Sequence, residues 1–138
     1  MNSNQPEKYL FVMQSVQEDN VPFHTVEAEV FGFGHAEVGA LLGEKWGFSD
    51  GLCGAILRHH GWRNFDGGIP EEVRELSLIV AMADALCTKL GIGYKSPMAE
   101  LDLGEKELLE KLDIGNSRYD AITSRFKETF LKEKMHFM

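Results

Sequence analysis

Residues 76–87 read Leu-Ser-Leu-Ile-Val-Ala-Met-Ala-Asp-Ala-Leu-Cys, and this stretch decides the fold. Apolar residues lie on every side of a helix drawn through it, and only Ser77 and Asp84 interrupt them. The pattern predicts a central helix that begins at Pro70, ends before Gly91 and is buried on nearly all sides. Asp84 would then be a buried carboxylate, which needs a cation or several hydrogen-bond donors.

The remaining sequence has the same helical periodicity, so we predict an all-α fold. A first helix is expected after Pro6, with an apolar face made by Tyr9, Met13 and Val16. A short helix capped by Thr25 follows and ends at Gly32.

Four more predicted helices complete the pattern. From His35 to about Trp46 the apolar stripe is His35, Val38, Leu42 and Trp46, and Gly39 allows a neighbouring helix to approach closely. Ser49 is a candidate N-cap for the following helix. An acidic helix near residues 105–112 and a last helix, capped by Asn116 or Ser117, end the chain.

Length and charge restrict the class of protein. The 138 residues suit one domain, which we expect to consist of a core portion, 1–103, and C-terminal helices, 104–138. The formal net charge of −8 disfavours nucleic acid and anionic membrane surfaces as partners. No apolar stretch is long enough for a bilayer and no leader pattern is present, so we expect a cytoplasmic protein. Cys53 and Cys87 each stand alone in apolar patterns, which indicates reduced thiols.

Four residues on three predicted helices could bind a metal ion: His35, His59, His60 and Asp84. Imidazole and carboxylate suit divalent first-row ions or Mg²⁺, and facing helices of a bundle can hold such ligands around one site. Neighbouring helical residues point about 100° apart, so His59 and His60 share one ion only if the helix frays there. In the alternative interpretation, His35 is a hydrogen-bonded core histidine and Asp84 pairs with an arginine or backbone amides.

Several segments of the sequence belong together: Gly34-His35-Ala36-Glu37-Val38-Gly39, Trp46, Ala55-Ile56-Leu57-Arg58-His59-His60 and Ile79-Val80-Ala81-Met82-Ala83-Asp84-Ala85. In combination they resemble one family, the HDOD domain of the HD superfamily. The resemblance covers about residues 27–94 and looks like the C-terminal portion of such a domain. It implies an all-helical, HD-like bundle that is incomplete at its N-terminal side.

The resemblance also implies a metal site and a chemistry. Matched by position, His35, His59, His60 and Asp84 correspond to metal ligands of the family, with Fe, Mn, Zn or Mg as candidate ions. Catalytic members are metal-dependent phosphohydrolases that act on nucleotides or cyclic dinucleotides. Their defining adjacent His-Asp pair is missing, because no histidine of this chain is followed by aspartate. Catalytic residues therefore stay unassigned.

We expect an HDOD-like regulatory module of bacterial signal transduction that keeps part of the metal pocket without hydrolysis. Its partner would be a signalling protein or a nucleotide, and apolar faces without cover would favour a homo-oligomer. Two alternatives stay open. The chain could be an active phosphohydrolase whose site is rebuilt with help from Glu27, Glu29 or His24, or a structural interaction domain without metal.

Overall fold

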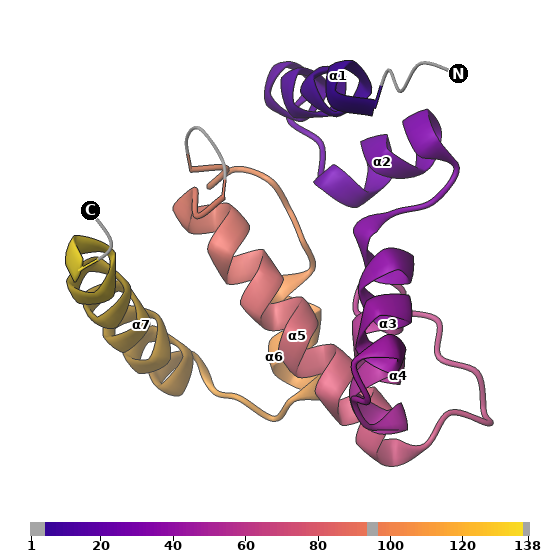
Figure 1. Ribbon diagram of the computed structural model, residues 1–138. Helices are drawn as coiled ribbons and strands as arrows, with labels where there is room; N and C mark the ends of the chain where they lie inside the picture. The colour runs from indigo at the N-terminus through magenta and orange to yellow at the C-terminus, as the bar shows by residue number, and fades with distance from the viewer. Residues whose placement is uncertain (1–4, 94–96, 137–138) are drawn as a thin grey trace. The chain divides into compact units, whose positions relative to one another are not determined.

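The computed structural model describes residues 5–93 and 97–136, and within these ranges the chain forms helices and no strand (Figure 1). This confirms the predicted all-α class. In chain order the helices are α1 (Gln5–Asp19), α2 (Phe23–Phe31), α3 (His35–Lys45), α4 (Asp50–Arg58), α5 (Glu71–Leu90), α6 (Glu105–Lys111) and α7 (Asn116–His136).

The helices fall into two compact units. The first, residues 1–103, contains α1 to α5, and the second, residues 104–138, contains α6 and α7. All four candidate metal ligands belong to the first unit. None of the helices, as far as the chain is described, is long and apolar enough to cross a membrane.

Small residues form the contact between α3 and α4. A Cβ atom added at Gly39 would lie 3.0 Å from Cγ2 of Ile56, and one added at Gly43 would lie 3.1 Å from Sγ of Cys53. The predicted role of Gly39 is therefore confirmed. The predicted N-cap of α4 is confirmed too, because Oγ of Ser49 accepts a hydrogen bond from the backbone N–H of Leu52 at 3.3 Å.

The predicted apolar stripe of α3 is wrong. Its large members Val38, Leu42 and Trp46 are exposed, Trp46 by 68%. The buried residues of α3 are Ala36, Ala40 and Gly43. The physical reason is the close approach of α4, which only small side chains permit.

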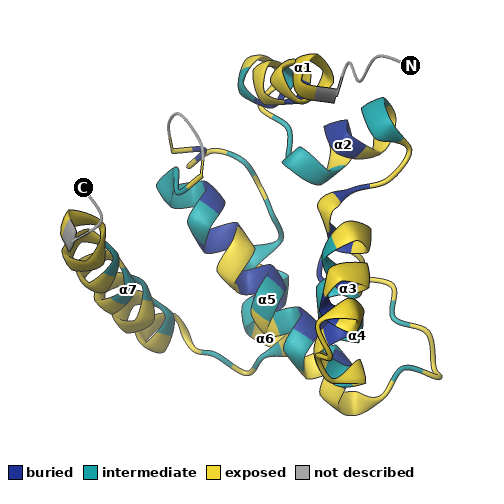
Figure 2. Ribbon diagram, in the orientation of Figure 1, coloured by how far each residue is buried: buried dark blue, intermediate teal, exposed yellow. Residues whose placement is uncertain are grey.

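The central helix α5 begins after Pro70 and ends at Gly91, as predicted. The expectation that it is buried on nearly all sides is wrong: Figure 2 shows exposed turns between buried ones, Ile79 is 49% exposed, and Asp84 is exposed. Its packed face mixes small residues with a few larger apolar ones, so apolar character alone does not mark it. The buried residues of α5 are Val73, Ser77, Ala81, Met82, Ala85, Leu86 and Thr88.

The helices α1 and α2 share a small core of their own. Val12 and Val16 of α1 are fully buried and pack with Val26 of α2 and with Met98. Tyr9 and Met13 are exposed, so two of the three residues predicted for the buried face of α1 were wrong. One turn separates Val12 from Val16, which is sufficient for a narrow contact stripe.

The start of α2 differs from the prediction in a way that matters for the site. The helix begins at Phe23 after an extended Pro22, and not at a Thr25 cap. It ends, as predicted, at Gly32, whose φ of 78° is left-handed. His24 and Glu27 therefore belong to the same helix at a spacing of three, which places them on one face.

Candidate metal centre

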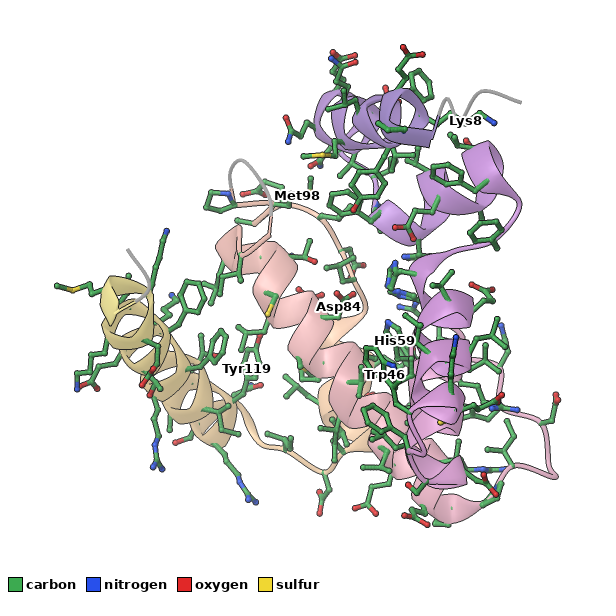
Figure 3. All side chains as sticks on the ribbon, viewed as in Figure 1. Lys8, Trp46, His59, Asp84, Met98 and Tyr119 are labelled. Carbon is green, nitrogen blue, oxygen red and sulfur yellow. The ribbon has the colours of Figure 1, made fainter. Side chains whose placement is uncertain are left out.

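Side chains from four helices surround one region of the first unit. In Figure 3, Asp84 of α5 lies on the side of that helix that faces His59. Both residues line one cavity of about 190 Å³, together with His24 of α2. A second cavity, of about 280 Å³, is lined by His24, His35, His60 and Asp84. The helices thus bring all four predicted ligands to adjoining cavities.

Three of the predicted ligands form a tight cluster. One ligand atom from each of His35, His59 and His60 lies within 4.8 Å of the other two. Among the described residues this cluster does not include Asp84. The close approach of His59 and His60 follows from the end of α4 at Arg58, because His60 then lies in a turn beyond the helix. Their ring centroids are 3.9 Å apart.

A buried carboxylate holds His35 in place. Oε2 of Glu27, a residue only 7% exposed, lies 2.6 Å from Nδ1 of His35 and also accepts the backbone N–H of His35 at 2.9 Å. A carboxylate accepts hydrogen bonds, so Nδ1 of His35 carries the proton and Nε2 carries the lone pair. This tautomer turns Nε2 into the atom available to an ion.

His59 is held in the same tautomer by a different partner. Its Nδ1 donates to the backbone carbonyl of Ile56, which can only accept, so Nε2 carries the lone pair. The His59 residue is 7% exposed, and its hydrogen bond to Ile56 fixes the orientation of the imidazole.

His60 completes the cluster through a bond between two imidazoles. Its Nε2 lies 2.8 Å from Nε2 of His35. Because Nε2 of His35 accepts, Nε2 of His60 donates. Burial and, to a smaller extent, the neighbouring His59, His24 and His35 together lower the pKa of His60 to about 2. His60 is therefore neutral at physiological pH, as a metal ligand has to be.

His24 covers His60 from α2. The two rings are stacked, with centroids 3.9 Å apart and an interplanar angle of 17°. Burial lowers the pKa of His24, although the nearby charge of Asp84 acts against this shift. Its Nδ1 is buried and has no hydrogen-bond partner in the described part of the chain. A buried, unpaired ring nitrogen in a cavity wall is a further potential donor to a ligand.

Sequence reasoning did not identify how His24 and Glu27 are used. Both were considered only as possible aids to a rebuilt catalytic site. The spacing of three between them was the available signal, but it points to the site only when the helix begins before His24. The expected start at Thr25 left His24 outside the helix.

Comparison with known proteins finds a family to which part of the chain is similar. Residues 1–62 match the family model of the HDOD domain. We call this stretch, which is similar to the HDOD domain, the HDOD segment. The HDOD match includes His35, His59 and His60, together with Glu27, whereas Asp84 lies beyond it. The HDOD match begins and ends earlier than residues 27–94, the range over which the sequence motifs resemble this family.

One relative of this chain is a protein of Treponema pallidum (strain Nichols), described as uncharacterized. It is 30% identical over 79 residues, which are 57% of this chain. The chain spans about 15% of the length of that relative. No solved structure matches the chain.

The three histidines fit the metal that an HD-type domain implies. The ring N–H of His35 donates to the Glu27 carboxylate and that of His59 donates to a backbone carbonyl, and these are the usual outer partners of ligating histidines. A set rich in imidazole suits Zn and Fe better than Mg, which prefers oxygen ligands. Asp84 supplies the nearby oxygen donor on the cavity wall.

Proposed function

We propose that this chain is an HDOD-like regulatory module that holds one divalent ion with His35, His59 and His60 and does not hydrolyse phosphoesters. The observation that carries the proposal is the cluster of three imidazole ligand atoms within 4.8 Å. Asp84 of α5, on the wall of the adjoining cavity, is proposed as the fourth ligand. Zn or Fe is the expected ion, with Mn and Mg less suited to three imidazoles.

The absence of hydrolysis follows from which residues remain for chemistry. In a phosphohydrolase, a bound metal ion polarises the phosphate and activates a water molecule. Around the cluster, Glu27 already accepts two hydrogen bonds from His35, and no histidine is followed by the aspartate of the family's defining pair. The chain therefore retains residues for holding an ion and lacks the pair that would complete a catalytic centre.

The proposed role is to receive a signal in the cytoplasm by binding a protein partner or a nucleotide. Self-association of the chain is a further proposal. It rests on the HDOD segment and on the exposed apolar side chains of α3, Leu41 and Trp46 among them. Exposed apolar surface is typical of contact sites.

Elemental analysis of protein purified without an affinity tag tests the proposal. We expect about one divalent ion per chain, as a single cluster of three ligands can hold. His35→Ala and His59→Ala should each lose most of it, while the surface change Lys132→Ala should not. Metal-free protein that takes up no Zn²⁺ or Fe²⁺ on titration would favour the structural interaction domain instead.

The second candidate is an active metal-dependent phosphohydrolase. The observation in its favour is that Asp84, His24 and His60 line both cavities beside the cluster, so that a carboxylate and two further imidazoles adjoin it. Incubation with cyclic dinucleotides, nucleoside monophosphates and a model phosphodiester tests it. We expect no turnover above a metal-only blank. Hydrolysis that disappears in His60→Ala and persists in Lys132→Ala would establish the enzyme and overturn the regulatory proposal.

A further inference from the structure

Two glutamates bind the first residues of α3, but only one of them touches a histidine ring. Oε2 of Glu37 accepts the backbone N–H of Gly34 at 2.9 Å, and Oε2 of Glu27 accepts the backbone N–H of His35 at 2.9 Å. Both carboxylates therefore satisfy free amides at the positive end of the α3 dipole. Glu27 alone adds the contact with Nδ1 of His35 at 2.6 Å.

The position of Glu27 gives this second contact its strength. Glu27 is 7% exposed, whereas the His35 side chain is 43% exposed. The carboxylate is therefore the fixed member of the pair, and the partly exposed ring is the member that needs support. Hydrogen bonds to an ionised carboxylate are about twice as strong as neutral ones. A ring that could otherwise rotate about its side-chain bonds is thus held with Nε2 turned toward His60.

We propose that Glu27 is a positioning residue of the metal centre: it fixes the tautomer and orientation of His35, so that Nε2 is presented to an ion. This inference rests on the proposed function of the three-histidine cluster. Glu27 itself does not touch the ion, because both of its contacts are to nitrogens of His35. The carboxylate also increases the electron density of the imidazole, which strengthens His35 as a ligand.

The test uses Glu27→Gln, with Glu37→Gln as the matched control. Glutamine keeps the size of the side chain and an acceptor oxygen and removes the charge, so α3 keeps its N-terminal hydrogen bonds in both variants. Co²⁺ is the probe, because its visible absorption reports the number and geometry of its ligands. We expect Glu27→Gln to weaken Co²⁺ binding by roughly 10-fold to 100-fold, the usual effect of mutating an outer hydrogen-bond partner, because a neutral amide oxygen accepts the His35 ring N–H more weakly than a carboxylate does. Glu37→Gln should stay within about 3-fold of the parent, because it leaves that outer partner in place.

A second readout does not depend on metal at all. In chelator-treated protein, nitrogen-15 NMR of the imidazoles shows which nitrogen of His35 carries the proton. We expect the proton on Nδ1 in the parent and in Glu37→Gln, and a mixture of tautomers in Glu27→Ala. Circular dichroism checks that each variant is folded. If Glu27→Ala is unfolded, Glu27→Gln takes its place in the NMR comparison.

The outcomes separate the inference from the proposed function. A parent that binds no Co²⁺ contradicts the metal module, while the NMR comparison still decides whether Glu27 sets the tautomer of His35. Equal weakening of Co²⁺ binding in both glutamine variants would show that Glu27 only stabilises the start of α3, and would overturn the inference. So would a proton found on Nε2 of His35 in the parent.

Discussion

His60 lies where a positive charge is strongly disfavoured, and this makes the stability of the protein depend on pH. Burial lowers its pKa to about 2 from the usual 6.5. The folded protein therefore binds a proton at His60 less readily than the unfolded chain does. The stabilisation is complete above pH 6.5 and is lost as the pH falls from there toward 2. Burial lowers the pKa of His24 as well, so its contribution has the same sign.

We expect a lower melting temperature at about pH 5 than at about pH 7.5, because the unfolded histidines are protonated at the lower value. The His60→Asn variant should lose less melting temperature over this interval than the parent, since it has one histidine fewer to protonate. Thermal melts by circular dichroism, in the presence of a chelator, measure both. An equal loss in parent and variant would mean that His60 is not a source of the pH dependence.

Asp84 is expected to matter for the site and not for the fold. Its sequence context predicted a buried carboxylate, for which removal of one half of a charge pair costs about 3 to 5 kcal/mol. The structure exposes it on the cavity wall. Asp84→Ala should therefore change the free energy of unfolding of chelator-treated protein by less than about 0.5 kcal/mol, as surface substitutions usually do.

Urea unfolding measures this change, with Glu75→Ala as the control, because Glu75 is another exposed carboxylate of α5. A loss of more than about 2 kcal/mol in Asp84→Ala alone, in the range of a broken buried interaction, would restore the interpretation of a buried charge.

At the scale of a helix, the sequence predicted the existence of elements better than their packed faces. Ser49 and Gly91 were correctly identified as the start of one helix and the end of another, because caps depend on local chemistry. The packed faces of α3 and α5 were missed. The packed face of α3 consists of Ala and Gly, and that of α5 mixes Ala, Ser and Thr with larger apolar residues. Large apolar residues such as Val38 and Ile79 are instead exposed.

The same reasoning explains which site residues could be predicted. His35, His59 and His60 stand out in the sequence because they are polar residues on or beside apolar helix faces. Their contact depends on a turn after Arg58, which the adjacent pair of histidines suggested but did not require. Glu27 reaches His35 across the break between α2 and α3, eight residues away, and no helical periodicity spans such a break.

Gly43 tests the small-residue contact between α3 and α4. A methyl group there would lie 3.1 Å from Sγ of Cys53 and 3.1 Å from Cδ2 of Phe48. Overpacking of this kind costs about 1 to 3 kcal/mol. Replacing a helical glycine by alanine stabilises the helix by about 1 kcal/mol, because alanine has the higher helix propensity. We expect Gly43→Ala to lower the free energy of unfolding by about 1 kcal/mol, the difference between the two effects.

Urea unfolding of Gly43→Ala is compared with that of Gly67→Ala, where an added Cβ meets no atom within 4 Å. The loop variant should differ from the parent by no more than about 0.5 kcal/mol. A Gly43→Ala protein that is more stable than the parent would show that α3 and α4 can separate at little cost.

For the whole molecule, the HDOD segment and the folding unit do not end at the same residue. The family match ends at residue 62, but α4 packs against α5, which begins at Glu71. A Cβ added at Gly54 of α4 would lie 3.1 Å and 3.2 Å from the methyl groups of Val73, so the two helices are in direct contact. Without α5, the face of α4 at Gly54 would lose the cover that Val73 provides.

We therefore expect residues 1–62 alone to lack a cooperative thermal transition, and residues 1–103, one compact unit, to melt cooperatively. Circular dichroism melts of the two fragments, measured beside the full chain, check this. A cooperative melt of residues 1–62 would contradict the assigned dependence of α4 on α5. Failure of residues 1–103 to fold would mean that the C-terminal helices are required.

The bond between His35 and His60 has a consequence for how the centre would open. The proton on Nε2 of His60 forms a hydrogen bond to Nε2 of His35, 2.8 Å away, and this bond holds the two rings together. To present both lone pairs to one ion, His60 first has to change tautomer, so that Nε2 gives up its proton and Nδ1 of the same ring carries one. The resting centre is therefore closed by its own hydrogen bond. Its rate of opening, visible as exchange of the His60 ring N–H with water, sets an upper limit on how fast the cluster can be loaded.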